Sequence, residues 1–214
     1  MASPLTPPGV LAYLTGAYAP LAILAYGSYA DGSWGPDSDF DALVLTAGGP
    51  ERHDMSVVGS VQLDAFVYPV SRFDEPFAPS AFPQLADAAL LLDTEGRGQT
   101  LIDRVRAWRS MQPLPTPEEL RSQATWCRKM LRRAGRGDTE GLFRWHWVLV
   151  DSLEIFCLLA GQPYQGPKKS LRWLAEARPE AYALYSAALA RPELPALERW
   201  IAHLEGLCAS LPQT

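Results

Sequence analysis

Three acidic residues in the first third of the chain have the chemistry and the spacing to bind divalent cations. Asp39 and Asp41 lie two positions apart at the start of an apolar run, and Asp64 lies in the middle of the next such run. Alternate residues of a strand project from one face about 7 Å apart, so Asp39 and Asp41 are predicted to share a face. Asp64 joins that face if its strand pairs alongside with a matching pleat. Clustered carboxylates at this spacing favour hard cations such as Mg²⁺.

A Gly-Ser corner precedes these acids and supplies a complementary chemistry. Gly27 and Ser28 end an apolar run over residues 21–26, and a turn rich in Gly, Ser, Pro and Asp leads on to Asp39. A glycine lets the backbone approach an anion closely, and a serine offers a hydroxyl and an amide N–H to phosphate oxygens. Phosphate and metal binding at one corner indicate phosphoryl or nucleotidyl transfer.

The spacing of these residues resembles the motif of the DNA polymerase beta-type nucleotidyltransferase superfamily. It looks most like the small bacterial members, which include the aminoglycoside nucleotidyltransferases and the minimal nucleotidyltransferases. The matching residues are Gly27-Ser28, nine intervening residues, Ser38-Asp39-Phe40-Asp41, and Asp64 in the following strand. The motif covers residues 21–67, and the strand, turn and helix predicted over residues 88–110 also resemble those proteins.

The resemblance implies that Ser28 contacts the β- and γ-phosphates of a nucleoside triphosphate, while Gly27 allows the close approach. Ser38, within the same motif, is grouped with these nucleotide-binding residues. Many relatives carry a basic residue where this chain has Asp31. One phosphate contact is therefore expected to be missing here or to be supplied from elsewhere in the chain.

The resemblance also implies that Asp39 and Asp41 bind two Mg²⁺ ions and that Asp64 binds one of them. Asp64 is then a candidate to accept the proton of the attacking hydroxyl, and all three acids are assigned to catalysis as well as to metal binding. Taken singly, a Gly-Ser turn or a pair of acids at the end of a strand is usually a solvated turn. A degenerate, inactive copy of the site is a further alternative, which the presence of all three acids disfavours.

The elements that must position this corner are predicted from apolar runs and turn residues. The strands of a small mixed sheet are predicted over residues 21–26, 39–46, 57–68 and 88–93. Flanking helices are predicted over residues 9–18 and 101–111. A cluster of prolines (Pro113, Pro115 and Pro117) then marks the predicted domain boundary.

Beyond the prolines the chain changes to an all-helical pattern. Helices are predicted over residues 117–133, 139–159, 167–177, 179–190 and 195–210. The predicted fold class is therefore α+β. A small mixed β-sheet nucleotidyltransferase domain with flanking helices covers residues 1–112, and a C-terminal helical bundle that binds the substrate covers residues 113–214.

The helical half offers two further groups of candidate binding residues. Asp151 and Glu154 fall on one stripe of the long predicted helix with Arg144. This stripe is either an internal salt-bridge set or solvent face, or a surface where the two acids bind an amino-bearing substrate or supply a general base. Lys168 and Lys169 begin the next helix, where a bound anion would relieve their repulsion from the helix dipole. The resemblance implies that one of the two lysines reaches the triphosphate, and a solvated helix start is the alternative.

The composition is that of a globular protein, with 48% hydrophobic and 20% charged residues. The formal net charge of −5 repels nucleic acid at long range and favours a cationic substrate. Three widely spaced cysteines without a CxxC pattern, and an N-terminus without a signal-peptide pattern, predict a cytoplasmic protein. Charged residues within 142–160 argue against a membrane span there.

These features together predict a metal-dependent nucleotidyltransferase that moves NMP, with AMP as the first candidate, from ATP or another NTP to a hydroxyl of a small molecule. An aminoglycoside-type antibiotic is the first acceptor considered, and two Mg²⁺ ions are the expected cofactors. One alternative is a minimal-nucleotidyltransferase antitoxin-like protein that binds or adenylylates a protein partner. Another is a non-catalytic nucleotide-binding module. The sequence leaves both a monomer and a homodimer open.

Overall fold

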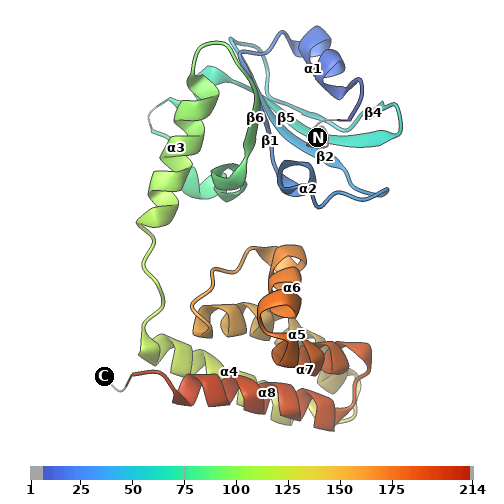
Figure 1. The fold of residues 1–214 in the computed structure, drawn as a ribbon, viewed down its shortest axis with the longest axis vertical. Coiled ribbons are helices and arrows are strands. Elements are labelled where there is room, and N and C mark those ends of the chain that lie inside the picture. Colours follow the sequence, from blue (N-terminus) through green and yellow to red (C-terminus); the bar gives the residue numbers. More distant parts are fainter. Residues whose placement is uncertain (1–6, 75, 213–214) are drawn as a thin grey trace. The chain divides into compact units, whose positions relative to one another are not determined.

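The computed structural model describes residues 7–74 and 76–212 of the 214-residue chain. The chain divides into two compact units, Met1–Gln112 and Pro113–Thr214 (Figure 1). The division falls at the first proline of the cluster singled out in the sequence. The functions assigned to the two units stay predictions.

A mixed sheet, six-stranded in the described part of the chain, forms the centre of the first unit (Figure 1). Its strands are β1 (Ala22–Ala25), β2 (Phe40–Thr46), β3 (Arg52–Asp54), β4 (Val57–Val58), β5 (Val61–Pro69) and β6 (Ala89–Asp93). They follow the order β3-β5-β2-β1-β6, with β4 paired to β5. The β2–β5 pair is parallel and the other pairs are antiparallel. A mixed sheet followed by a helical region confirms the predicted α+β fold class.

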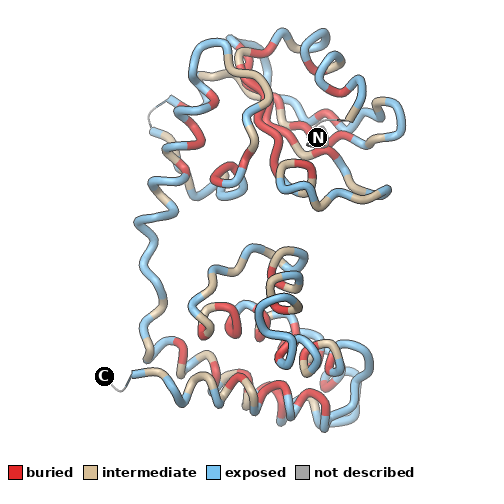
Figure 2. The backbone as a smooth tube through the Cα atoms, viewed as in Figure 1, coloured by how far each residue is buried: buried red, intermediate tan, exposed pale blue. Residues whose placement is uncertain are grey.

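The central strands are apolar on both faces because helices cover both sides of the sheet. All four residues of β1 are buried, as expected for a strand between two packed layers. Helix α1 (Val10–Tyr18) packs Leu14 into the core on one face, and helix α3 (Arg97–Ser110) packs Ile102 into the core on the other. Figure 2 shows these buried segments along the middle of the unit.

Strand β5 alternates in burial along its length. Leu63, Ala65 and Val67 are buried on the face that α1 covers. Asp64 and Phe66 are half-buried on the opposite face, where Phe66 packs against the core formed with α3. This period of two places the acid in the middle of the apolar run on the α3 face of the sheet.

The structure differs from the predicted elements at several places in the first unit. Strand β3 lies where no strand was predicted, because Arg52-His53-Asp54 gives no apolar run. The strand predicted over residues 57–68 is two strands, β4 and β5, joined by a turn at Gly59, whose φ is +65°. The turn predicted after β1 begins with a short helix, α2 (Gly27–Asp31), and α3 begins at Arg97 rather than at residue 101.

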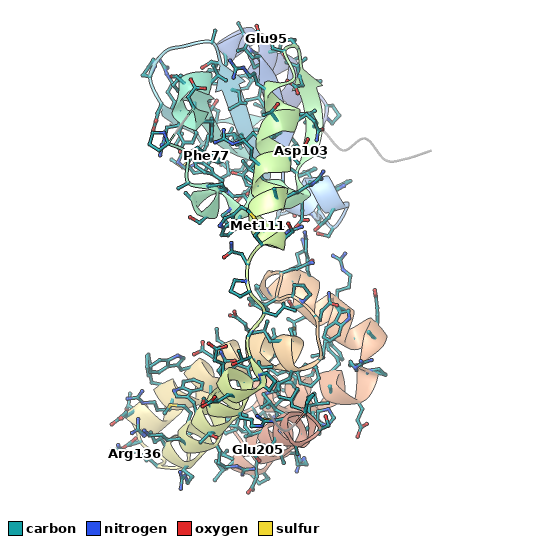
Figure 3. All side chains as sticks on the ribbon, turned by 90° about the vertical axis from the view of Figure 1, so that its left-hand side faces the viewer. Phe77, Glu95, Asp103, Met111, Arg136 and Glu205 are labelled. Carbon is teal, nitrogen blue, oxygen red and sulfur yellow. The ribbon has the colours of Figure 1, made fainter. Side chains whose placement is uncertain are left out.

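Short 3₁₀ helices connect β5 to β6 and cover part of the α3 face. They are η1 (Val70–Phe73), η2 (Pro79–Ala81) and η3 (Pro83–Asp87), and η2 and η3 each begin at a proline. Phe77, labelled in Figure 3, packs edge-on against Phe73 with ring centroids 5.5 Å apart. The Arg104 guanidinium of α3 lies 4.5 Å from the centre of the Phe77 ring. These contacts hold the segment against α3.

The second unit is a bundle of helices, which agrees with the predicted C-terminal architecture. The helices are α4 (Pro117–Ala134), α5 (Thr139–Leu159), α6 (Gly166–Ala177), α7 (Pro179–Ala190) and α8 (Leu194–Ala209), each within one residue of its predicted bounds. Their core is apolar with paired polar groups: the Trp200 indole N–H donates to Ser152 Oγ, and the Tyr185 hydroxyl donates to the Leu149 carbonyl, both at 2.8 Å. Within residues 7–74 and 76–212, no helix combines the length and apolar character needed to cross a membrane.

Candidate active site

Asp41 and Asp64 lie side by side on neighbouring parallel strands. Asp41 is the second residue of β2, and the β2–β5 register pairs it with Asp64. Register partners in a parallel ladder project from the same face, so the two carboxylates share the α3 face of the sheet. Both residues are half-buried, whereas Asp39 lies just before β2 and is exposed.

Gly27 lies against the Asp41 carboxylate. Where the chain leaves β1, the Tyr26 N–H donates to the Asp41 carbonyl at 3.1 Å, and Gly27 then takes a φ of +66°. A Cβ added at this position would collide with Oδ2 of Asp41. The glycine is therefore required by its left-handed backbone and also by the close approach of the carboxylate. Gly27 therefore leaves room for the Asp41 carboxylate.

The segment between α2 and β2 is ordered by its own hydrogen bonds. The Ser33 N–H donates to the Ser28 carbonyl and to Oδ1 of Asp31, both at 2.9 Å. The Gly35 N–H donates to Oγ of Ser38, also at 2.9 Å. Asp31 and Ser38 thus stabilise this turn. Asp31, which stands where many relatives carry a basic residue, therefore has a structural role. The nucleotide-binding role of Ser38 stays a prediction.

His53 contacts Asp64, and the sequence had assigned no chemistry to this histidine. Its Nε2 lies 2.5 Å from Oδ1 of Asp64, and its ring stacks on Phe66 with centroids 4.3 Å apart. Both polar side chains remain partly open to solvent, 40% exposed for His53 and 39% for Asp64. Strand β3 brings the histidine there because its antiparallel register pairs His53 with Phe66. In the sequence, only the polar triplet Arg52-His53-Asp54 ahead of an apolar run could have indicated this contact.

Tyr26 is buried beside the two carboxylates. Burial raises the pKa of its phenol well above the usual range, and the negative charges of Asp64 and Asp41 raise it further. A hydrogen bond with Gln84 acts in the opposite direction. The phenol is therefore a neutral hydrogen-bonding group around pH 7, and it adds no charge to the two acids.

The described part of the chain contains no group of three or more His, Cys, Asp or Glu side chains arranged to hold a metal ion. Only two of the three predicted carboxylates are paired in the structure. Asp41 and Asp64 are register partners, whereas Asp39 lies outside the strand. Proteins commonly hold Mg²⁺ by one or two carboxylates together with substrate phosphates and water. The Asp41–Asp64 pair fits that arrangement, and the metal-binding roles of the three acids stay predictions.

Residues 14–88 match the family model of the nucleotidyltransferase domain. The resemblance to the nucleotidyltransferases is confirmed. The matched segment runs from α1 to the residue before β6 and includes Gly27, Asp41, His53 and Asp64. The match supports transfer of a nucleoside monophosphate as the general activity of the matched segment.

One solved structure with a similar chain is described as a nucleotidyltransferase-like protein from Exiguobacterium sibiricum 255-15. The two chains are 16% identical, the alignment covers 94% of this chain and 72% of that chain, and the TM-score is 0.39. No curated protein matches the chain significantly.

Outside the nucleotidyltransferase domain, Asp151 and Glu154 of α5 line one cavity of about 380 Å³ within the second unit. Gln123 and Trp126 of α4 form the opposite wall, and Oε1 of Gln123 is buried without a hydrogen-bond partner among the described groups. The residues that line this space therefore bring two carboxylates, an indole and an amide together. This arrangement suits a ligand with positive charge and hydrogen-bond donors, and the substrate-binding role stays a prediction.

The remaining predicted residues lie elsewhere in the second unit. Arg144 pairs with Glu140 at 3.4 Å, and its guanidinium lies 5.1 Å from the centre of the Trp147 ring. Lys168 is exposed and Lys169 is half-buried in the first turn of α6. A contact from either lysine to a triphosphate stays a prediction.

Proposed function

We propose that this chain transfers a nucleoside monophosphate, with AMP as the first candidate, from an NTP to a hydroxyl of a small molecule, with Mg²⁺ as the cofactor. The observation that carries the proposal is the pairing of Asp41 with Asp64 beside Gly27, inside the segment that matches the nucleotidyltransferase domain. The two acids can hold a divalent cation, and the glycine beside them lets a phosphate group approach the backbone closely.

The Gly-Ser corner is proposed to bind the triphosphate. Gly27 and Ser28 are the first two residues of α2. Backbone N–H groups at the start of a helix have no acceptor within the helix, so they can donate hydrogen bonds to phosphate oxygens. Ser38 lies in the turn that returns the chain to β2 and is grouped with them. Lys168 or Lys169 supplies a further positive charge, since no basic side chain stands at position 31.

The carboxylates are proposed to serve the cation and the acceptor. Asp41 and Asp64, with Asp39, hold Mg²⁺, which neutralises the triphosphate and activates the attacking oxygen when it is bound. The acceptor oxygen forms a bond to the α-phosphorus while the bond to the bridging oxygen breaks, and pyrophosphate leaves. The acceptor proton passes to the carboxylate of Asp64. His53 orients that carboxylate through the contact at 2.5 Å.

The acceptor is proposed to carry amino groups, as an aminoglycoside does. Asp151 and Glu154 line a cavity of about 380 Å³ with Trp126, so an ammonium group there would meet two carboxylates and an aromatic face. The net charge of −5 adds a general attraction for cations. A polyanionic acceptor such as nucleic acid would be repelled by the same charges.

Incubation with α-labelled NTPs and Mg²⁺, against a panel of aminoglycosides, lincosamides and cell lysate, tests this function. Label should move to an amino-bearing small molecule while pyrophosphate is released. Label on a protein of the lysate would instead support an antitoxin-like protein that adenylylates its partner. Binding of NTP without transfer to any acceptor would support a nucleotide-binding module.

A further inference from the structure

An aromatic cavity of about 200 Å³ lies on the same sheet face as Asp41 and Asp64. Its floor is formed by strand residues and its roof by the segment over η2 and η3. The residues that define its chemistry are Tyr26, Leu43, Phe66, Tyr68, Phe82 and Gln84. All of them belong to the first unit and lie within the segment that matches the nucleotidyltransferase domain.

The walls of this cavity suit a flat heteroaromatic ring. Tyr68 and Phe82 meet edge to face with centroids 6.2 Å apart, and Phe66 lies 6.1 Å from Tyr68. The faces and edges of aromatic rings pack favourably against another planar ring. Gln84 adds an amide that donates and accepts hydrogen bonds at one edge. None of the described lining residues carries a charge, so the cavity suits neither a triphosphate nor an ammonium group.

The cavity lies at the correct spacing from the carboxylates for a nucleotide. Leu43 and Phe66 are register partners two residues beyond the Asp41–Asp64 pair on the same face. Two residues of a strand span about 7 Å, a gap that the ribose and the α-phosphate of a nucleotide bridge. Tyr26 lines the cavity and lies close enough to both carboxylates for their charges to act on its phenol.

We propose that this cavity binds the nucleobase of the NTP donor, with the α-phosphate held at the Asp41–Asp64 pair. The inference rests on the proposed function, and it adds a base-binding subsite to the metal and phosphate contacts. It assigns Phe66, Tyr68 and Phe82 to binding the base ring and Gln84 to hydrogen bonds with its edge. The nucleoside part of the donor then contributes affinity that the phosphates alone do not supply.

Calorimetry with a non-hydrolysable ATP analogue and with inorganic tripolyphosphate, both in Mg²⁺, separates the base from the phosphates. Stacking of a base on aromatic side chains predicts that the analogue binds the wild-type protein roughly tenfold or more tighter than tripolyphosphate. Ala81, an exposed residue that lines the cavity, provides the variant, because Ala81→Trp fills the space without removing a core side chain. It should lower the affinity for the analogue to that for tripolyphosphate and leave tripolyphosphate binding unchanged.

Ala78→Trp is the matched control, since Ala78 is exposed in the same segment and does not line the cavity. It should bind both ligands as the wild-type protein does. Gln84→Leu is the second variant, for the case in which Ala81→Trp does not fold. It should weaken binding of the analogue alone.

Two results would overturn the assignment of the base while leaving the proposed function intact. One is equal affinity of the wild-type protein for the analogue and for tripolyphosphate. The other is tight binding of the analogue by the wild-type protein that does not change in folded Ala81→Trp or in Gln84→Leu. That result is expected if the cavity binds part of the acceptor instead of the base. Failure of the wild-type protein to bind either ligand would overturn both the base assignment and the proposed function.

Discussion

Gly27 and His53 each fix one carboxylate of the site. Gly27 leaves room for the Asp41 carboxylate, which a Cβ would displace. His53 lies 2.5 Å from Oδ1 of Asp64 and is itself held by stacking on Phe66. The two acids are thus positioned from different elements, α2 on one side and β3 on the other. Single substitutions at these supports should change the site without removing an acid.

Gly27→Ala should abolish nucleotide transfer, while Gly32→Ala should retain it. Both glycines have positive φ (+66° and +74°), so each substitution costs about 1–2 kcal/mol of folding free energy for a left-handed alanine. Only at Gly27 does the new methyl group collide with Asp41, whereas the space around Gly32 is open. Urea unfolding measures the shared cost, and transfer of label from an α-labelled NTP measures the difference. Equal activity of the two variants would contradict the proposed contact.

His53→Leu should reduce transfer activity by about 10- to 100-fold, in the range found when a partner of a metal-binding carboxylate is removed. His53→Gln retains a hydrogen-bond donor near the position of Nε2 and should recover much of the activity. The Mg²⁺ concentration for half-maximal nucleotide binding, measured by calorimetry, should rise for the leucine variant and change little for the glutamine variant. Identical behaviour of the two variants would show that His53 only fills space.

At the scale of elements, α1 is fastened to β3 by one buried carboxylate. The hydroxyls of Tyr18 and Tyr13 donate to Oδ2 of Asp54 at 2.6 and 3.1 Å, and the Ser56 N–H donates to Oδ1 at 2.9 Å. Burial alone would raise the pKa of Asp54, but the hydrogen bonds from Ser56, Tyr18 and Tyr13 outweigh it and hold the pKa below its usual value. This network anchors β3, the strand that carries His53.

Tyr18→Phe should lower the free energy of unfolding by about 1–3 kcal/mol at pH 7, because it removes a hydrogen bond to a buried charged group. The stabilisation from a carboxylate with a lowered pKa is complete above its unfolded pKa of about 3.9 and is lost as the pH falls through the folded pKa. The effect of Tyr18→Phe should therefore be full at about pH 5 and smaller at about pH 3 in urea unfolding. Tyr182→Phe, at an exposed tyrosine of the second unit, should have little effect at either pH.

The sequence predicted most of the elements but missed some of the supports of the site. Apolar runs identified β1 and β2, because their residues pack into the layers on both faces of the sheet, and β6, whose Leu91 and Leu92 pack against one of these layers. The polar triplet of β3 gave no such signal, so the contact from His53 to Asp64 could not be predicted. The need for glycine at position 27 was predicted for anion binding, and the structure adds the Asp41 carboxylate as a second reason. Register and close approach arise from pairing of distant segments, which local patterns do not encode.

At the scale of the whole molecule, the chain consists of two units joined by a proline-rich segment. The segment between α3 and α4 is exposed, as its pale colour in Figure 2 shows. It includes Met111, which is 73% exposed, and Leu114, which is 81% exposed. Proline composition predicted this boundary region, because prolines remove backbone donors and end helices. The helical pattern predicted the second unit closely, since its amphipathic helices bury one stripe each.

Limited proteolysis with chymotrypsin should cut first between residues 111 and 116 and release fragments that correspond to the two units. Exposed segments without helical or sheet hydrogen bonds are the preferred sites of cleavage. Leu142 and Phe143 are also exposed but lie within α5, where hydrogen-bonded backbone resists the protease. Mass spectrometry of the early fragments identifies the site. A first cut at residues 142–143 would contradict the assignment of two separately folded units.

The most direct test of the central claim compares Asp41→Asn with Asp37→Asn in NMP transfer from an α-labelled NTP in Mg²⁺. Asp37 is an exposed acid of the same turn, so both variants lose one negative charge within a few residues of each other. The proposed site predicts that Asp41→Asn abolishes transfer and that Asp37→Asn retains it. Full activity of Asp41→Asn would contradict the assignment of the Asp41–Asp64 pair as the site of nucleotide transfer.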